Sequence, residues 1–224
     1  MNPYAVLAAA AAEWDTVGPR LDDHVREELA VLLTRVRAAA RLEADPADPA
    51  GTAERAVEML RTVLPDRFGP GRFAPATFRP DTDDGLDASY LGFRAEDLAV
   101  LLLDGHRMVG PVLGAVRERL LAAPAVDGDT VLRAGGDPYA PGLVRLRGEG
   151  GVLRLPAFQF SEGTLPWLTV LEVNEVLGAD TDPWGAADWW LSENAWLGAV
   201  PARLLGTPDD RRLAATARHL TEGE

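Results

Sequence analysis

The sequence contains no cysteine and no lysine. The absence of cysteine excludes structural disulfides, thiolate zinc sites and cysteine nucleophiles, and it fits a reducing compartment. All 22 basic residues are arginines, and 35 acidic residues bring the net charge to −13. Proteins that bind nucleic acid usually present a basic footprint, so any contact with DNA would have to be local. DNA is therefore not an expected partner.

Long hydrophobic runs are also missing. No apolar segment approaches the roughly 18–20 residues that a membrane-spanning helix needs. The apolar run from Ala5 to Ala12 has no positive residue before it, and Glu13 and Asp15 follow it, so it does not fit a signal peptide. We therefore expect a cytoplasmic protein without a membrane span. With 224 residues, 47% of them hydrophobic, the chain can form one large domain or two small ones.

The sequence lacks the familiar signatures of catalysis. The three histidines, His24, His106 and His219, are far apart along the chain and show no spacing typical of a metal site or a triad. No G-x-S-x-G, P-loop or dinucleotide-binding fingerprint occurs. We therefore expect no catalytic residues, no cofactor and no metal, and we interpret the chain as a non-enzymatic protein.

One acidic cluster invites comparison with a calcium loop. It contains four aspartates, Asp81, Asp83, Asp84 and Asp87. An EF-type loop needs glycine at its sixth position and an acidic residue at its twelfth, but here Gly85 comes one position early and Gly92 stands at the twelfth. Carboxylates that cap turns are the better explanation.

Periodic apolar residues predict a mainly α-helical protein. Residues 21–42 place apolar side chains at steps of three and four, which is typical of one face of an amphipathic helix. A second helix is expected from a Thr52 cap to Val63, and further helices over 94–104 and 111–123. Residues 65–92 are rich in Pro, Gly and Asp and are expected to form an irregular loop.

The C-terminal third has a different pattern. Residues 126–142 contain at most one short helix, and residues 144–155 alternate around a glycine-rich turn, which predicts a small β-hairpin. Four helical segments should follow, one with an Asp182 cap and the last capped by Thr207. We thus expect three regions: a helical region over 1–92, a helical middle region over 93–142 and a compact helical domain over 143–224.

The segment DPWGAADWWLSENAWLG, residues 182–198, holds four of the six tryptophans. A cluster of aromatic residues at helical spacing is more often core than binding site, because each indole buries about 150–250 Å². Trp184 is therefore expected in the core, facing the strand Phe158–Phe160. Adjacent residues on a helix point about 100° apart, so either Trp189 or Trp190 should turn toward the surface.

The order of these motifs resembles the C-terminal toxin-binding domain of the Xre/MbcA/ParS antitoxin family. In that family a strand of the form Y/F-P-x-F-Q-F precedes D-P-W, W-L/F and P-N-x-x-L-x-G-x-x-P-x-x-L-L. Residues 143–220 carry the resemblance, and Glu193 departs from it where proline is common. The motif residues, which the resemblance implies to form the core, are Pro156, Phe158, Gln159, Phe160, Pro183, Trp184, Leu191, Pro201, Leu204 and Leu205.

The resemblance implies a protein that docks on a RES-domain, NAD-consuming toxin and covers its active-site cleft. We place the partner-binding residues in the tryptophan-rich segment, at Trp189, Trp190, Asn194, Trp196 and Leu197. The family keeps its DNA-binding helix-turn-helix near 107–142, where this chain has several glycines and prolines that disfavour a recognition helix. A DNA-binding regulator and a structural adaptor are the alternative interpretations, and self-association stays open.

Overall fold

The computed structural model describes residues 2–40, 49–69 and 88–221. It shows mainly α-helix with small antiparallel strand pairs, which confirms the expected fold class. The chain divides into two compact units, residues 1–115 and 116–224, here called unit 1 and unit 2, and each is described by itself. Their boundary falls within the region expected as the middle one, 93–142. Over the described residues, no helix has both the length and the apolar character that a membrane crossing requires.

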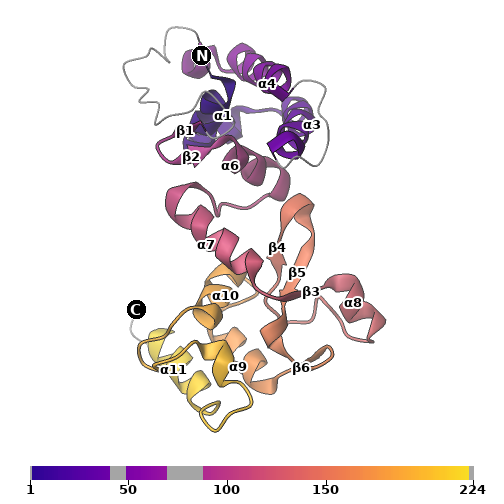
Figure 1. The fold of residues 1–224 in the computed structure, drawn as a ribbon, viewed down its shortest axis with the longest axis vertical. Helices are drawn as coiled ribbons and strands as arrows, with labels where there is room; N and C mark the ends of the chain where they lie inside the picture. The colour runs from indigo at the N-terminus through magenta and orange to yellow at the C-terminus, as the bar shows by residue number, and fades with distance from the viewer. Residues whose placement is uncertain (1, 41–48, 70–87, 222–224) are drawn as a thin grey trace. The chain divides into compact units, whose positions relative to one another are not determined.

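Unit 1 is built around α1, Pro3–Ala12, which the sequence analysis did not anticipate. Asn2 caps this helix by accepting a hydrogen bond from the Tyr4 amide at 2.9 Å. Alanine has the highest intrinsic helix propensity, and its small side chain lets neighbouring elements approach closely. The helix is buried on nearly all sides and packs against α4, α6 and the β1–β2 hairpin (Figure 1).

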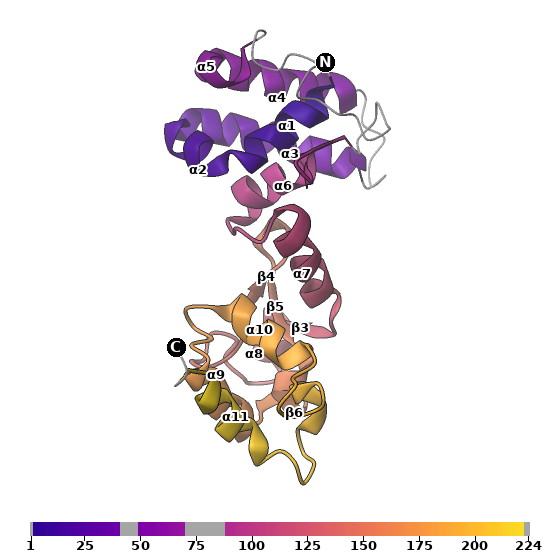
Figure 2. The same ribbon diagram turned by 90° about the vertical axis from the view of Figure 1, so that its left-hand side faces the viewer.

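The two amphipathic helices expected near the N-terminus are present as α3, Asp23–Ala40, and α4, Pro49–Val63. They pack against each other in unit 1 (Figure 2). The expected start of the second helix was wrong by one turn, because Pro49 occupies its first turn and Thr52 is a buried residue inside it. The shorter helical segments nearby are α2, Trp14–Val17; η1, Gly18–Arg20; and α5, Pro65–Phe68.

The rest of unit 1 begins with a two-residue turn between β1, Ser89–Tyr90, and β2, Phe93–Arg94. The helix expected over 94–104 consists of α6, Ala95–Ala99, and a π-helical turn, Val100–Asp104. The helix expected over 111–123 is α7, Gly110–Ala122. The aspartates 81, 83, 84 and 87 of the calcium-loop comparison lie outside the described residues.

Unit 2 contains the predicted hairpin as β4, Leu146–Arg147, and β5, Leu153–Pro156, joined through the short 3₁₀ segment η3, Glu149–Gly151. A third strand, β3, Ala125–Asp127, pairs with the other edge of β5, so the sheet order is β3-β5-β4. The one short helix expected after it is α8, Gly128–Arg133.

The chain then forms η4, Ala157–Gln159, and a second antiparallel pair, β6, Phe160–Glu162, with β7, Leu165–Pro166. The helices that follow are α9, Leu168–Val176; α10, Pro183–Leu191; η5, Pro201–Leu204; and α11, Arg212–Thr221. Asp182 caps α10 as expected, because its carboxylate accepts from the Gly185 amide at 2.9 Å. The expected start of the last helix was wrong, since turns occupy residues 207–211 and α11 begins at Arg212.

Candidate functional site

The buried side chain of Gln159 joins the segment before β4 to the end of β5 by hydrogen bonds. Gln159 is fully buried, and its Oε1 accepts from the Val144 amide at 2.6 Å. Its Nε2 donates to the carbonyls of Val144 at 3.0 Å and Pro156 at 3.2 Å. A buried side-chain amide is tolerated only when its hydrogen bonds are made, and this one makes three. Gln159 therefore fixes the chain before β4 against the end of β5.

A second buried amide, Asn174 on α9, joins two other segments. The indole Nε1 of Trp190 donates to Asn174 Oδ1 at 2.7 Å, and Asn174 Nδ2 donates to the Gly142 carbonyl at 2.6 Å. Both side chains are fully buried. Asn174 was not predicted from the sequence, although a single amide among the apolar residues of a buried helix indicates a side chain that needs hydrogen-bond partners.

Trp190 is the central aromatic residue of unit 2. Its ring lies 5.1 Å from that of Phe158 and 5.0 Å from that of Trp189, the second contact being edge-on. The expectation that Trp184 faces Phe158 was wrong, because Trp184 is half-buried and packs on a different cluster, which contains Leu120 and Ala186. Helical spacing predicted that Trp189 and Trp190 could not both be buried, but it did not predict which of the two is.

The other motif residues lie in or at the edge of the core of unit 2. Pro156 and Pro201 are buried. The half-buried members are Phe158, Phe160, Pro183, Leu191, Leu204 and Leu205. Unit 2 is thus organised around the residues that carry the resemblance.

Burial decides which of the predicted partner-binding residues a partner could touch. Trp190 is 0% exposed and Leu197 is 7% exposed, so in the folded unit both are core residues and neither presents a contact surface. Trp189 is half-buried, and its Nε1 has no hydrogen-bond partner among the described residues. Asn194 accepts from the amides of Trp196 at 3.0 Å and Leu197 at 3.2 Å, which shapes the loop.

Trp196 is the exposed member of the set. Trp196 is 56% exposed. All six tryptophans lie in the described part of the chain, and the other five are buried or half-buried. The ring of His219 meets it edge-on, with centroids 5.6 Å apart. Arg212 Nη2 donates to the Trp196 carbonyl at 3.1 Å, which ties the loop to α11.

A hollow of about 510 Å³ opens beside this indole. Its lining comes from the loop, from the turn before α11 and from one side of α11, and we call it the Trp196 hollow. The lining residues are Trp196, Arg211, Arg212, Ala215, Thr216 and His219.

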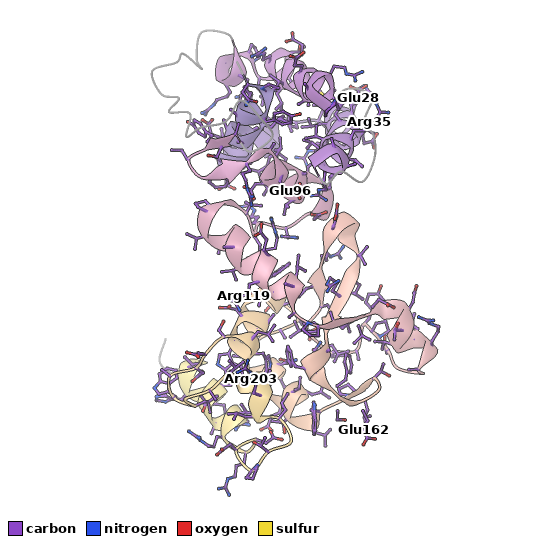
Figure 3. The ribbon with its side chains drawn as sticks, viewed as in Figure 1. Glu28, Arg35, Glu96, Arg119, Glu162 and Arg203 are labelled. Atoms are coloured by element: carbon purple, nitrogen blue, oxygen red, sulfur yellow. The ribbon has the colours of Figure 1, made fainter. Side chains whose placement is uncertain are left out.

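At the surface of unit 2, Arg119 of α7, which is labelled in Figure 3, forms an ion pair with Asp188 of α10. The C-terminal half of α7 also places Leu120 and Val116 in one of the unit's hydrophobic clusters. Within the described ranges, no three histidine, aspartate or glutamate side chains gather in a way that could hold a metal ion. That the protein needs no metal stays a prediction.

Comparison with known proteins adds no relative. No protein-family model matches the chain. Searches of curated proteins and of solved structures also return no match.

Proposed function

We propose that the chain is a non-enzymatic, cytoplasmic docking protein of the antitoxin type, and that unit 2 binds and inhibits a RES-domain, NAD-consuming toxin. One observation carries the proposal. The motif residues lie in or at the edge of the core of unit 2, while Trp196 from the same segment stands outside it.

The exposed indole of Trp196 offers a partner a large contact surface. Tryptophan is enriched at protein interfaces, because it offers a large rigid surface with few rotatable bonds. The backbone of Trp196 is held by the Asn194 turn and by Arg212, and its ring contacts that of His219, so little conformational freedom would be lost on binding. An ordered, exposed aromatic side chain of this kind favours a protein partner.

The geometry of residues 124–142 gives little support to a DNA-binding regulator. The helix α8 is short and is followed by turns in which Gly135 has a φ of +84°. Helix-turn-helix proteins place a recognition helix in the major groove, and its N-terminal residues contact the bases. The stretch 107–154 carries seven arginines and five acids, a net charge of only +2. This small positive charge would attract the phosphate backbone of DNA only weakly.

Co-expression tests the proposal. The proposal predicts that a neighbouring reading frame encodes a RES-domain protein, that the full chain forms a stable complex with it, and that the chain suppresses its consumption of NAD⁺. Full NAD⁺ consumption in the presence of excess chain would contradict inhibition. Absence of a RES-domain reading frame would contradict the toxin assignment and favour the structural adaptor.

A further inference from the structure

We propose that the Trp196 hollow receives a carboxylate-bearing segment of the partner protein, an inference that rests on the proposed function. The hollow combines an exposed aromatic wall with two arginines, Arg211 in the turn before α11 and Arg212 at the start of α11. It is open to solvent over the exposed indole, so a segment of a partner could enter without rearrangement of unit 2.

The charged groups that line the hollow have one sign. They are the guanidinium groups of Arg211 and Arg212, and no carboxylate is part of the lining. Asp209 lies outside the lining and pairs with Arg212 Nη1 at 3.5 Å. Arg211 is exposed and has no ion-pair partner within the described ranges. A carboxylate in the hollow would therefore meet at least one arginine that has no competing acid.

The negative charge of the rest of the chain favours the hollow as the place where an acidic segment binds. The whole chain carries −13, and residues 151–200 contain seven acids and one arginine. An acidic segment is repelled by most of this surface and attracted by the hollow, so electrostatics would steer it to one place and fix its register. The pairing with arginine would be charge-assisted, and arginine binds carboxylates in a bidentate manner.

The hollow suits a short peptide segment better than a nucleic acid. Its volume of about 510 Å³ can hold one or two side chains, whereas a duplex would extend beyond it onto the acidic surface. The indole of Trp196 supplies an apolar face for a residue next to the carboxylate. We therefore expect the partner segment to contain aspartate or glutamate beside an apolar residue.

Charge reversal in the hollow tests this inference. The measurement is the calorimetric Kd of the full chain for the RES-domain partner, at about 50 and 300 mM NaCl, which shortens the screening length about 2.4-fold. Arg211→Glu should weaken binding at least about tenfold at low salt, with a smaller loss at high salt. Arg147→Glu, the same change at an exposed arginine on β4 outside the hollow, should leave Kd within about threefold.

Circular dichroism confirms that the variants are folded, and Arg211→Gln provides a milder change that should give an intermediate loss. A partner acid-to-arginine substitution should restore binding to Arg211→Glu. Equal losses for Arg211→Glu and Arg147→Glu would overturn the inference while leaving the proposed function intact. Failure of the unaltered chain to bind the partner would remove both.

Other occupants give distinct results. ADP and a duplex oligonucleotide are titrated into the full chain alone; binding that Arg211→Glu abolishes would overturn the inference and assign the hollow to phosphate. Sedimentation of the full chain alone tests for a second copy. A dimer that Trp196→Ala dissociates would overturn the inference in favour of self-association.

Discussion

Two side-chain amides organise the interior of unit 2 at the scale of single residues. Gln159 joins the segment before β4 to the end of β5, and Asn174 links Trp190 to the Gly142 carbonyl. Fully satisfied buried polar networks favour one arrangement of the backbone, because every alternative leaves a donor or acceptor unpaired. The tryptophan-rich segment is thereby anchored in a core that has one defined arrangement of hydrogen bonds.

Trp190 and Trp196 should respond in opposite ways to the same substitution. Trp190→Ala should lower the free energy of unfolding by about 3–5 kcal/mol, because it removes a buried indole and leaves Asn174 without its donor. Trp196→Ala should lower it by less than about 1 kcal/mol, since the side chain is exposed. Urea denaturation of both variants measures the difference. Equal losses would contradict the assignment of Trp190 to the core and Trp196 to the surface.

The sequence predicted the composition of this core better than its geometry. The resemblance and the residue patterns placed Phe158 and Gln159 in the core but assigned Trp190, which is buried, to partner binding. They could not decide that Trp190 rather than Trp184 reaches Phe158, since that depends on how α10 is rotated about its axis. Asn174 was missed because its partners, Trp190 and Gly142, lie in other segments.

At the scale of elements, a buried ion pair connects α3 with the π-helical turn in unit 1. Arg37 makes two bonds of 3.0 Å to Asp104, and both side chains are 5% exposed. Arg37 Nε also lies 3.2 Å from a carboxylate oxygen of Glu96. Desolvated charges of this kind are tolerated only while the partners remain together.

Arg37→Met should therefore destabilise unit 1 by about 3–5 kcal/mol, because it leaves Asp104 buried without its cation. Arg35→Met is the matched control, since Arg35 is an exposed residue of the same helix (Figure 3). The control should change the free energy of unfolding by less than about 1 kcal/mol. Thermal denaturation monitored by circular dichroism compares the two, and an equally small effect of Arg37→Met would rule out a stabilising ion pair.

The Asp127 cap should make the stability of α8 depend on pH. Its carboxylate caps α8, accepting from the Thr130 amide at 2.6 Å and from the Thr130 hydroxyl at 3.0 Å. The bond from the Thr130 amide, then that from the hydroxyl, holds the pKa of Asp127 below its ordinary value of 3.8. The folded pKa is lowered, so the cap stabilises above the unfolded pKa and is lost as pH falls through the folded one.

An NMR titration of the Asp127 carboxyl measures this directly, and we expect a midpoint below 3.8. Asp127→Asn, which keeps a capping oxygen, should remove the acid-dependent change in the α8 amide shifts. A midpoint at or above 3.8 would contradict the capping geometry.

The sequence located elements with a clear period and missed those without one. α3 was predicted closely because its apolar residues mark one face. α1 was not predicted, since a helix that is apolar on all sides has no period to detect. The start of α11 was misplaced because Thr207 forms a turn, donating to the Leu204 carbonyl at 2.7 Å, and so does not cap the helix.

At the scale of the whole molecule, the division of the chain revises which fragment should carry the docking function. The motif residues lie within 143–220, which from sequence alone suggests that a fragment of residues 140–224 suffices. Unit 2 also contains Leu120 in its core and β3 on the open edge of β5. A fragment without them loses a strand and a buried leucine.

We therefore expect residues 109–224 to fold cooperatively and residues 140–224 to lose at least about 3 kcal/mol of stability or fail to fold. Urea denaturation of the two fragments tests this. Equal midpoints would show that α7 and β3 contribute nothing to unit 2.

If unit 2 docks on a RES-domain toxin through Trp196, as we propose, the calorimetric affinity of the full chain for that toxin should depend on this side chain. Trp196→Ala should weaken binding by at least about 2 kcal/mol, or roughly thirtyfold, as expected for an interface hot spot. Tyr139→Ala, which removes a 69% exposed aromatic side chain elsewhere in unit 2, should leave the affinity unchanged. Absence of a complex, or equal affinities for the two variants, would contradict the account.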